Sequence, residues 1–478
     1  MAIEKATIVL YPSMGVGHLA PMVHLAKRFV QHGFSVTVAI ADQTPNSSTN
    51  EAMSNLSMAN PSISFHALPL VSFTPAENSH PLQVIYDTIR EYNPKFLEFL
   101  TSLSTTTTIH AIVIDFFRTD AIGIARQLGI PVYVFFASGA SILALSLHLP
   151  LHHATSKTSF KDMGNATVNF PGAPPIPASG VPETLLDRAS EIYHTRIRNF
   201  TQLREVDGIL VNSFEALEQK AVKALKEGLC LPGHTMPPVY CIGPLITVSQ
   251  EKSLLEKNEC LNWLDSQPKR SVIFLSFGSA GAFTAKQINE IAIGLEKSGQ
   301  RFLWVVRSTD NPKKLCVSLP DPDLDSLLPE GFLSRTKERG MVVKSWAPQV
   351  EVLNHESIGG FVSHCGWNST LEAMVAGMPI ICWPLYAEQR LNKVILEEEI
   401  KVGVVMKGYN EELVSAEEVE EKARWLMESK EGQMLRERMV AVQKKAFQAL
   451  AKDGSSEMVF TSFLRDLRII KSTTRADQ

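Results

Sequence analysis

Short apolar runs, rich in β-branched and aromatic residues, alternate with segments of helical length along almost the whole chain. In the first half these runs lie at Thr7–Tyr11, Ser35–Ile40, Ala111–Phe116, Val132–Phe136 and Gly208–Asn212. In the second half they lie at Val272–Phe277, Phe302–Val306, Met341–Lys344, Gly360–Ser363 and Pro379–Trp383. Strands that are apolar throughout are typical of parallel sheets covered by helices on both faces. The alternation therefore predicts an α/β fold of doubly wound parallel sheets.

The pattern stops and restarts near the middle of the 478-residue chain. The stretch 244–258 is mixed and polar without a strong period, and we interpret it as a linker. We therefore expect two Rossmann-like domains that face each other across a cleft, an N-terminal one at 1–243 and a C-terminal one at 259–456. Charged residues are almost twice as dense after residue 250 as before it, which fits two domains with different surfaces.

The composition bears on which classes of binding partner to expect. The formal net charge of −4 gives no electrostatic reason to expect nucleic acid or an anionic membrane. The N-terminus carries no signature of signal-peptide cleavage, so we expect a cytoplasmic protein. We also expect a monomer. The apolar stretch Ile130–Pro150 is long enough for a membrane span, but it breaks at Ser138-Gly139. We interpret it as a buried strand followed by a buried helix and expect no stable span.

Metal binding is not expected either. The six cysteines show no CxxC pairing, and no carboxylate cluster has the spacing of metal ligands. His148, His152 and His153 lie close together, but no further ligands lie near them in the sequence.

Helix signals are clearest in the second half. Thr284 and Gln287, and likewise Ser415 and Glu418, have the spacing of a capping box, in which two side chains satisfy each other's backbone N–H groups. Residues 366–376 are predicted to form a helix that Gly377 closes.

In open parallel sheets, ligands bind beyond the carboxyl ends of the strands. His18 lies where the glycine-containing loop after the first strand enters a helix, so it is a candidate general base; a capping or packing role is the alternative. Asp115 ends another strand and could orient that imidazole, or it could cap the segment near Thr119. The loop glycines do not follow GxGxxG and no Walker lysine is present, which argues against a dinucleotide site or a P-loop.

The second half carries a denser set of polar residues at strand ends. His364, Asn368 and Ser369 surround a predicted helix start whose N–H groups favour a diphosphate, and Glu372 lies one turn further on the same face. Trp346 is suited to stacking on a base, Glu388 and Gln389 to binding sugar hydroxyls, and the Phe277-Gly-Ser279 turn, more weakly, to a phosphate.

Together these residues resemble a known signature. Trp346-Ala-Pro-Gln349, His364-Cys-Gly-Trp-Asn-Ser369, Glu372 and Glu388-Gln389 are similar to the signature box of plant family-1 UDP-dependent glycosyltransferases, which act on secondary metabolites. Pro12–Pro21 resembles the acceptor loop of that family and Phe277–Ser279 its phosphate loop. The stretch Pro384–Arg390 resembles the branch that acts on flavonoids, chalcones and other phenolics.

The resemblance implies a GT-B fold whose last helix, at about 457–470, packs back on the N-terminal domain. It implies that His18 is the base, that Asp115 is its partner, and that the C-terminal domain binds the UDP-sugar. The residues implied in UDP-sugar binding are Ser279, Trp346, Ala347, Gln349, His364, Trp367, Asn368, Ser369, Glu372, Glu388 and Gln389.

The implied function is inverting transfer of glucose from UDP-glucose to a hydroxyl of a small phenolic acceptor, such as a flavonoid or a chalcone, without a metal or other cofactor. In the family that the chain resembles, Gln389 favours glucose over galactose and Trp367 disfavours UDP-glucuronate, while arabinose and xylose stay open as the transferred sugar. A C-glycosyltransferase that attacks from an activated ring carbon stays open, as do an NAD-dependent oxidoreductase and a non-catalytic nucleotide-sugar-binding protein. Phe116, Phe117, Tyr193 and Phe200 are candidates for the acceptor pocket or for the core.

Overall fold

The computed structural model describes residues 6–41, 48–77, 79–246, 258–310 and 319–474. Its internal contacts divide the chain into two units. Unit 1 comprises Met1–Leu245 and Gln448–Gln478, and unit 2 comprises Ile246–Phe447. Of the predicted linker at 244–258, residues 247–257 lie outside the described residues.

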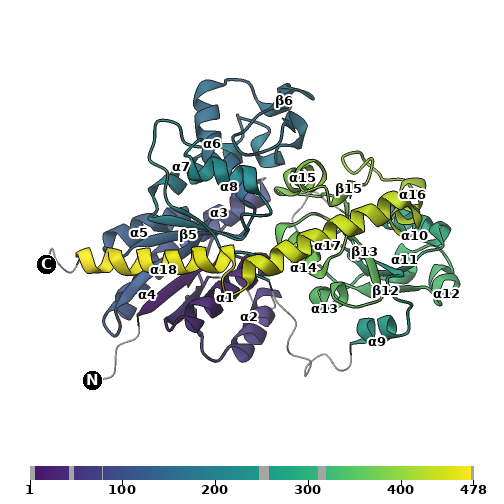
Figure 1. Cartoon of the computed structure of the whole chain (residues 1–478), viewed down its shortest axis with the longest axis horizontal. Helices are drawn as coiled ribbons and strands as arrows, with labels where there is room; N and C mark the ends of the chain where they lie inside the picture. Colours follow the sequence, from purple (N-terminus) through teal and green to yellow (C-terminus); the bar gives the residue numbers. More distant parts are fainter. Residues whose placement is uncertain (1–5, 42–47, 78, 247–257, 311–318, 475–478) are drawn as a thin grey trace. The chain divides into compact units, whose positions relative to one another are not determined.

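Unit 1 is built on a parallel sheet in the order β3-β2-β1-β4-β5-β8-β9 (Figure 1). Its strands are β1 (Thr7–Tyr11), β2 (Ser35–Ile40), β3 (Ser64–Ala67), β4 (Ile109–Asp115), β5 (Val132–Phe136), β8 (Gly208–Val211) and β9 (Val239–Cys241). A separate antiparallel pair consists of β6 (Thr167–Val168) and β7 (Ile176–Pro177). The predicted strands are confirmed, and β3 and β9 are additions at the two edges.

The helices of unit 1 connect these strands. They are α1 (Val16–Gln31), α2 (Ser48–Ala59), α3 (Pro81–Glu91), α4 (Asn93–Ser104), α5 (Ile122–Gln127), α6 (Ala140–Thr155), α7 (Glu191–Gln202), α8 (Gln219–Lys226) and α18 (Ser455–Thr474). Short 3-10 turns are η1 (Thr119–Ala121), η2 (Phe160–Asp162), η3 (Ala178–Gly180), η4 (Glu183–Leu185) and η5 (Leu203–Glu205). The apolar stretch from Ile130 thus forms β5 and then α6, whose first turns are buried. Within the described residues, no helix combines the length and the apolar character that crossing a membrane requires.

The C-terminal helix α18 belongs to the core of unit 1. Phe460, Phe463, Leu464 and Leu467 are buried together with residues of β1, β2, β4 and α1. The helix packs against β9 and β4, and it is the yellow helix that leads to the C-terminus in Figure 1. Polar contacts fix its start, because Arg28 pairs with Glu457 and the Ser456 hydroxyl donates to the Gly243 carbonyl at 2.6 Å.

Unit 2 repeats the architecture with a parallel sheet in the order β12-β11-β10-β13-β14-β15. Its strands are β10 (Val272–Ser276), β11 (Arg301–Val306), β12 (Gly340–Lys344), β13 (Ile358–Ser363), β14 (Ile380–Cys382) and β15 (Gly403–Val405). Its helices are α9 (Glu259–Asp265), α10 (Ala285–Ser298), α11 (Leu324–Leu327), α12 (Phe332–Thr336), α13 (Gln349–Leu353), α14 (Trp367–Ala376), α15 (Gln389–Val394), α16 (Ala416–Glu428) and α17 (Lys430–Leu450). A π-helical turn, η6 (Ile395–Glu399), follows α15. Two doubly wound parallel sheets confirm the predicted fold class.

Only one of the two hydrogen bonds of each predicted capping box forms. Thr284 and Ser415 each accept the expected backbone N–H, from Gln287 and Glu418 respectively. The return bonds are absent because the Gln287 side chain binds both backbone groups of Val414, and Glu418 accepts from the backbone N–H of Lys407. The partner side chains therefore tie loops to helices instead of closing the caps, and the prediction of reciprocal boxes is wrong.

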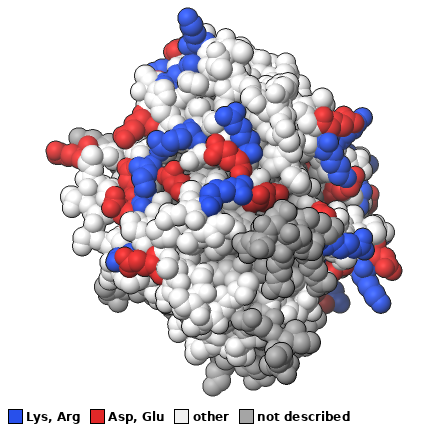
Figure 2. Space-filling model, turned by 90° about the vertical axis from the view of Figure 1, so that its left-hand side faces the viewer, with Lys and Arg blue, Asp and Glu red and all other residues white. Residues whose placement is uncertain are grey.

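The face of the molecule shown in Figure 2 carries basic and acidic side chains side by side on a largely uncharged surface. Ion pairs on unit 1 show the same mixing, for example Arg90 with Asp120 and Arg126 with Asp207. Charges of both signs therefore offset each other locally on this face.

Candidate active site

The first candidate site lies where the strand order of unit 1 reverses. β1 pairs with β2 on one side and with β4 on the other, and the chain crosses over in opposite directions from this point. Such a reversal leaves a crevice at the carboxyl ends of the two central strands. His18 follows β1, and Asp115 is the last residue of β4.

His18 and Asp115 are hydrogen-bonded as predicted. The Nδ1 atom of His18 lies 2.8 Å from Oδ2 of Asp115; the imidazole is 24% exposed and the carboxyl group is fully buried. The other oxygen, Oδ1, accepts the backbone N–H of Phe117 at 2.9 Å. The alternative that Asp115 caps the segment near Thr119 is wrong, because η1 begins after Arg118 and no side chain caps it.

This geometry fixes the chemistry of the imidazole. An ionised carboxylate only accepts hydrogen bonds, so the proton between the two groups belongs to Nδ1 of His18. The lone pair is then on Nε2, which can accept a proton from a substrate. Asp115 would stabilise the imidazolium that results, as the acid of a catalytic triad does.

His18 is held at the start of a helix. α1 begins at Val16, so His18 lies in its first turn, close to the predicted point where the loop enters the helix. Gly15 precedes the helix with φ 93°, a conformation that favours glycine. The short connection from β1 to α1 therefore determines where the imidazole lies.

Aromatic side chains surround this pair. The rings of Phe116 and Phe117 lie 5.9 and 5.0 Å from the His18 ring, and Phe117 is only half-buried. By contrast, Tyr193 and Phe200 are fully enclosed. Of the four predicted pocket aromatics, Phe117 is therefore the one best placed to meet an aromatic ligand beside His18, while Tyr193 and Phe200 belong to the core.

The second candidate site lies at the corresponding reversal in unit 2, between β10 and β13. His364 follows β13 and is buried between two glycines. A Cβ atom at Gly278 would lie 2.5 Å from its Nε2 atom, and one at Gly366 would lie 2.4 Å from the same atom. Burial lowers the pKa of His364 to about 4, so the ring is neutral at pH 7 and donates an N–H without carrying a net charge.

Helix α14 begins directly after His364. Gly366 precedes the helix without a side-chain cap, and Asn368 and Ser369 lie in the first turn. The N–H groups and the dipole of a helix start attract anions. The ten-residue helix closes at Gly377 in the left-handed conformation, which confirms the predicted helix.

A polar network joins α13 to α14. The Gln349 side-chain amide donates to the Ser369 hydroxyl at 2.8 Å and to the Glu372 carboxylate at 2.6 Å. Burial, reinforced by the nearby Glu351 charge, raises the pKa of Glu372 to about 7 although Gln349 donates to it. Trp346, three residues before Gln349, is 67% exposed, whereas Ala347 is buried. An exposed indole can stack on a base.

The other residues predicted to bind the UDP-sugar differ in how deeply they are buried. Trp367 is 2% exposed, Ser279 is exposed and Glu388 is half-buried. Gln389 is buried, and its side-chain carbonyl accepts the backbone N–H groups of Leu385 and Tyr386 at 2.8 and 2.9 Å. Gln389 therefore shapes the loop after β14, a role that the sequence did not indicate.

Arg307 is a further residue at this site that is not among the predicted ones. It follows β11, and its guanidinium donates to the main-chain carbonyls of Ser279 and Gly278. It thereby fixes the turn after β10 that was predicted to meet a phosphate. The sequence feature that could have identified this residue is its position, since an arginine directly after a strand lies at the carboxyl edge of the sheet.

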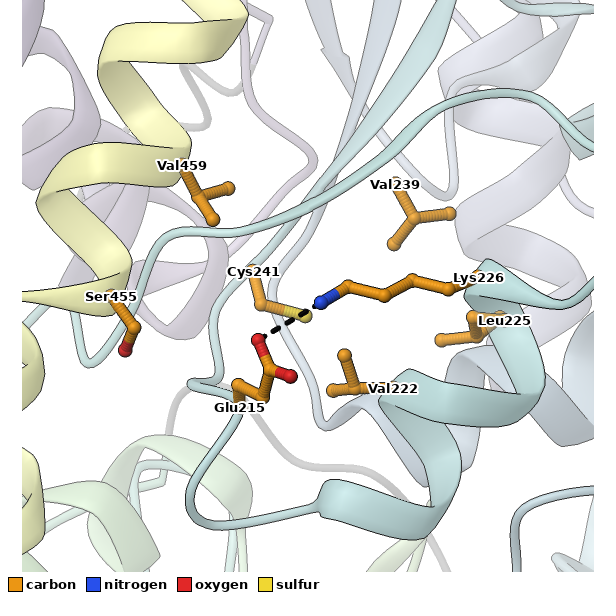
Figure 3. Close-up of a pocket in the computed structure, with 8 residues that line it drawn as sticks. All are labelled: Glu215, Val222, Leu225, Lys226, Val239, Cys241, Ser455 and Val459. Atoms are coloured by element: carbon orange, nitrogen blue, oxygen red, sulfur yellow. Dashed lines mark hydrogen bonds and ion pairs between the residues drawn. The ribbon is translucent and has the colours of Figure 1, made fainter.

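A small hollow elsewhere in unit 1 lies apart from the residues predicted to be functional. Figure 3 shows it between β9, α8 and the start of α18, with the Lys226 ammonium 2.9 Å from the Glu215 carboxylate. Burial raises the pKa of the Cys241 thiol in this hollow to about 12, so the sulfur is not a reactive thiolate. Within the described part of the chain, no group of three or more His, Cys, Asp or Glu side chains is arranged to hold a metal ion.

Comparison with known proteins identifies relatives over nearly the full length. A family model described as UDP-glucoronosyl and UDP-glucosyl transferase matches residues 205–434. Anthocyanidin 5,3-O-glucosyltransferase from a Rosa hybrid cultivar is 42% identical over 464 residues, which are 94% of this chain and 96% of that protein. Phloretin 2'-O-glucosyltransferase from Malus domestica is 44% identical over 478 residues, which are 96% of this chain and 99% of that protein. The solved structure of Phytolacca americana UGT2 complexed with UDP-2fluoro-glucose and pterostilbene is 37% identical with a TM-score of 0.86, and the match covers 97% and 99% of the two chains.

Proposed function

The chain belongs to the plant UDP-glycosyltransferases, and from this we propose that it transfers glucose from UDP-glucose to a hydroxyl group of a small phenolic acceptor, such as a flavonoid or a chalcone, with inversion at the anomeric carbon. The names of two relatives specify glucosyl transfer to an oxygen of anthocyanidin or phloretin. The structural relative holds a UDP-sugar analogue together with pterostilbene. Both observations support a phenolic acceptor for this chain.

The observation that carries the mechanism is the hydrogen bond of 2.8 Å between His18 and the buried Asp115. In the proposed step the acceptor oxygen attacks the anomeric carbon of glucose while the bond from that carbon to the diphosphate oxygen breaks. The acceptor proton passes to Nε2 of His18, and UDP leaves with the electron pair of the broken bond. Asp115 balances the charge of the imidazolium and keeps its Nδ1 proton in place.

We assign the nucleotide sugar to unit 2. Trp346 stacks on the uracil, and Gln349 and Glu372 bind the ribose. Ser279, His364, Asn368 and Ser369 bind the diphosphate together with the start of α14. The neutral His364 donates an N–H to the departing UDP, and the helix dipole stabilises its developing charge.

The transferred sugar is assigned to Trp367, Glu388 and Gln389, with Ala347 supporting the loop that carries Trp346. Because the carbonyl oxygen of Gln389 is used by Leu385 and Tyr386, we assign its sugar contact to the Nε2 amide group. An N–H donor there suits a sugar hydroxyl. The glucosyl transfer named for two relatives is the reason for proposing glucose as the transferred sugar.

The test is incubation of the purified full chain with UDP-glucose and a panel of phenolics, followed by mass and linkage analysis. A product with a β-linked O-glucoside supports the proposal. An α-linkage contradicts inversion, and a carbon–carbon link to the ring makes the chain a C-glycosyltransferase. A parallel reaction with excess chelator should keep its rate, because the proposed charge stabilisation comes from α14 and His364; loss of activity that Mg²⁺ restores would contradict that assignment.

A further inference from the structure

Arg118 is a charged residue in the interior of unit 1 that the proposed mechanism does not use. It lies three residues after Asp115, in the turn that follows β4, and its side chain is only 1% exposed. Arginine is rarely enclosed to this extent unless its charge and its donors serve a purpose. The contacts of the guanidinium indicate that purpose.

The guanidinium of Arg118 contacts the end of the neighbouring strand β1. Its Nε atom donates to the main-chain carbonyl of Pro12 at 2.6 Å. Its central carbon lies 3.8 Å from the centre of the Tyr11 ring, which is itself stacked at 3.8 Å on Phe96 of α4. The plane of the guanidinium and its directional donor both suit this position, which a lysine ammonium would fill less well.

The other side of the same turn is fixed independently. The backbone N–H of Arg118 donates to the Asp115 carbonyl at 2.8 Å. Asn199 of α7 donates to the Phe116 carbonyl at 2.9 Å and to the Thr119 hydroxyl at 2.7 Å. The turn is therefore held against α7 without the Arg118 side chain, which leaves that side chain to connect the turn to β1.

This contact joins the two strand ends that carry the proposed base and its partner. Pro12 is buried and directly precedes the short connection that leads to α1 and His18. Arg118 fixes the Pro12 carbonyl from the turn that begins at Asp115. The link between Pro12 and Arg118 thus connects the strand end that leads to His18 with the turn that begins at Asp115.

Building on the proposed function, we infer that Arg118 is a positioning residue that holds the loop before His18 so that the imidazole stays hydrogen-bonded to Asp115. Arg118 itself contacts neither the acceptor nor UDP. A displacement of about 1 Å at a catalytic group can lower a rate by about 10²-fold, so loss of this link should be visible in kcat.

The experiment uses three variants of the full chain, Arg118→Met, Arg118→Lys and Arg126→Met. Methionine keeps much of the length of the side chain but has no N–H donor, and lysine keeps the charge without the planar group. Arg126 is the matched control, because it is a half-exposed arginine of α5 that pairs with Asp207. We expect Arg118→Met to lower kcat by about 10- to 100-fold, Arg118→Lys by less, and Arg126→Met not at all, with KM for UDP-glucose within about twofold throughout.

A double-mutant cycle with His18→Ala separates positioning from a general loss of structure. The acceptor is an acidic phenol such as 4-nitrophenol, so that the slow His18→Ala reaction can be followed. If Arg118 acts through His18, Arg118→Met should lower the rate by less than about twofold when His18 is already alanine. Should Arg118→Met fail to fold, as judged by thermal unfolding, Arg118→Lys takes its place in the cycle.

Equal losses with and without His18 would overturn the inference, and so would unchanged kcat in both Arg118 variants. A large rise in KM for UDP-glucose at constant kcat would also overturn it, since it would place the effect on donor binding. Failure of the proposed function has a different signature, because His18→Ala alone would then retain the wild-type rate on a weakly acidic alcohol, whose proton needs a base.

Discussion

At the scale of one residue, Glu372 combines a cost in folding stability with its proposed role in ribose binding. Its carboxyl group is half-buried beside Gln349 and Glu351, and burial raises its pKa to about 7. Because this value exceeds the ordinary 4.5, the folded state holds the proton more tightly than the unfolded state does. Stability is therefore lost as the pH rises from 4.5 to 7, and the full cost remains above pH 7.

Replacing the Glu372 carboxyl group should raise the folding stability and weaken UDP binding. Glu372→Gln should leave stability unchanged at pH 4 and raise it at pH 8 by at most about 3 kcal/mol, since each pKa unit corresponds to about 1.4 kcal/mol and solvent screens part of the effect. The same variant should bind UDP more weakly, because an ionised carboxylate accepts ribose hydroxyls better than an amide. Unfolding curves at both pH values and calorimetry with UDP measure the two effects. The exposed Glu398→Gln is the control, and stabilisation that is equal at both pH values would contradict the argument.

Trp346 is the second residue whose surroundings support a ligand. An indole that is 67% exposed leaves much of its apolar surface in water, which a stacked base would cover. Trp346→Ala should weaken UDP binding by about 1–3 kcal/mol, the scale of base stacking on an aromatic ring. Met434→Ala removes another exposed apolar side chain, 51% exposed, and should leave UDP affinity unchanged in the same calorimetric titration. Equal affinities of Trp346→Ala and wild type would remove Trp346 from the nucleotide site.

At the scale of elements, α18 is a structural part of unit 1 although it is the last helix of the chain. Phe463 is fully buried, and its ring lies 5.1 Å from Tyr133 and 5.2 Å from Tyr240. Phe463→Ala should therefore destabilise the protein by about 3–5 kcal/mol in chemical unfolding. Met458 of the same helix is 58% exposed, and Met458→Ala should change stability by less than about 0.5 kcal/mol. Similar small effects of both substitutions would show that α18 does not support the fold.

The elements differ in how far the sequence predicts them. β1, β2 and β5 were predicted to the residue. β1 and β5 are buried along their whole length and appear as nearly continuous apolar runs, whereas β2 keeps the half-buried polar residues Ser35 and Thr37 in its run. The edge strands β3 and β15 were not predicted, since β3 is mostly exposed and β15 has only three half-buried residues. Tertiary contacts also override local signals, as the side chains of Gln287 and Glu418 show by binding loops instead of closing their caps.

In the molecule as a whole, both candidate sites lie at the reversal points of the two sheets. The pairing of His18 with Asp115 could be predicted, because β1 leads to His18 and β4 ends at Asp115, at the same edge of the sheet. The resemblance supplied the roles in unit 2, which the spacing of residues alone leaves open. The inward orientation of Arg118 and the loop contacts of Gln389 could not be predicted, because no pattern in the sequence shows which way a polar side chain folds after a strand ends.

The proposed placement of the base in unit 1 and of the nucleotide site in unit 2 can be tested directly. His18 and Asp115 belong to unit 1, and the proposed nucleotide residues belong to unit 2. Removing the base should therefore slow the chemical step without affecting UDP binding. The measurement is kcat for glucosyl transfer to a weakly acidic alcohol and to 4-nitrophenol, alongside calorimetric UDP affinity, in wild type, His18→Ala and Asp115→Asn.

We predict that His18→Ala lowers kcat for the alcohol by about 10²- to 10⁴-fold, that Asp115→Asn has an equal or smaller effect, and that UDP affinity stays within about twofold. The loss should be smaller for 4-nitrophenol, which needs less help to lose its proton. Wild-type activity of His18→Ala on the alcohol would contradict the assignment of His18 as the base.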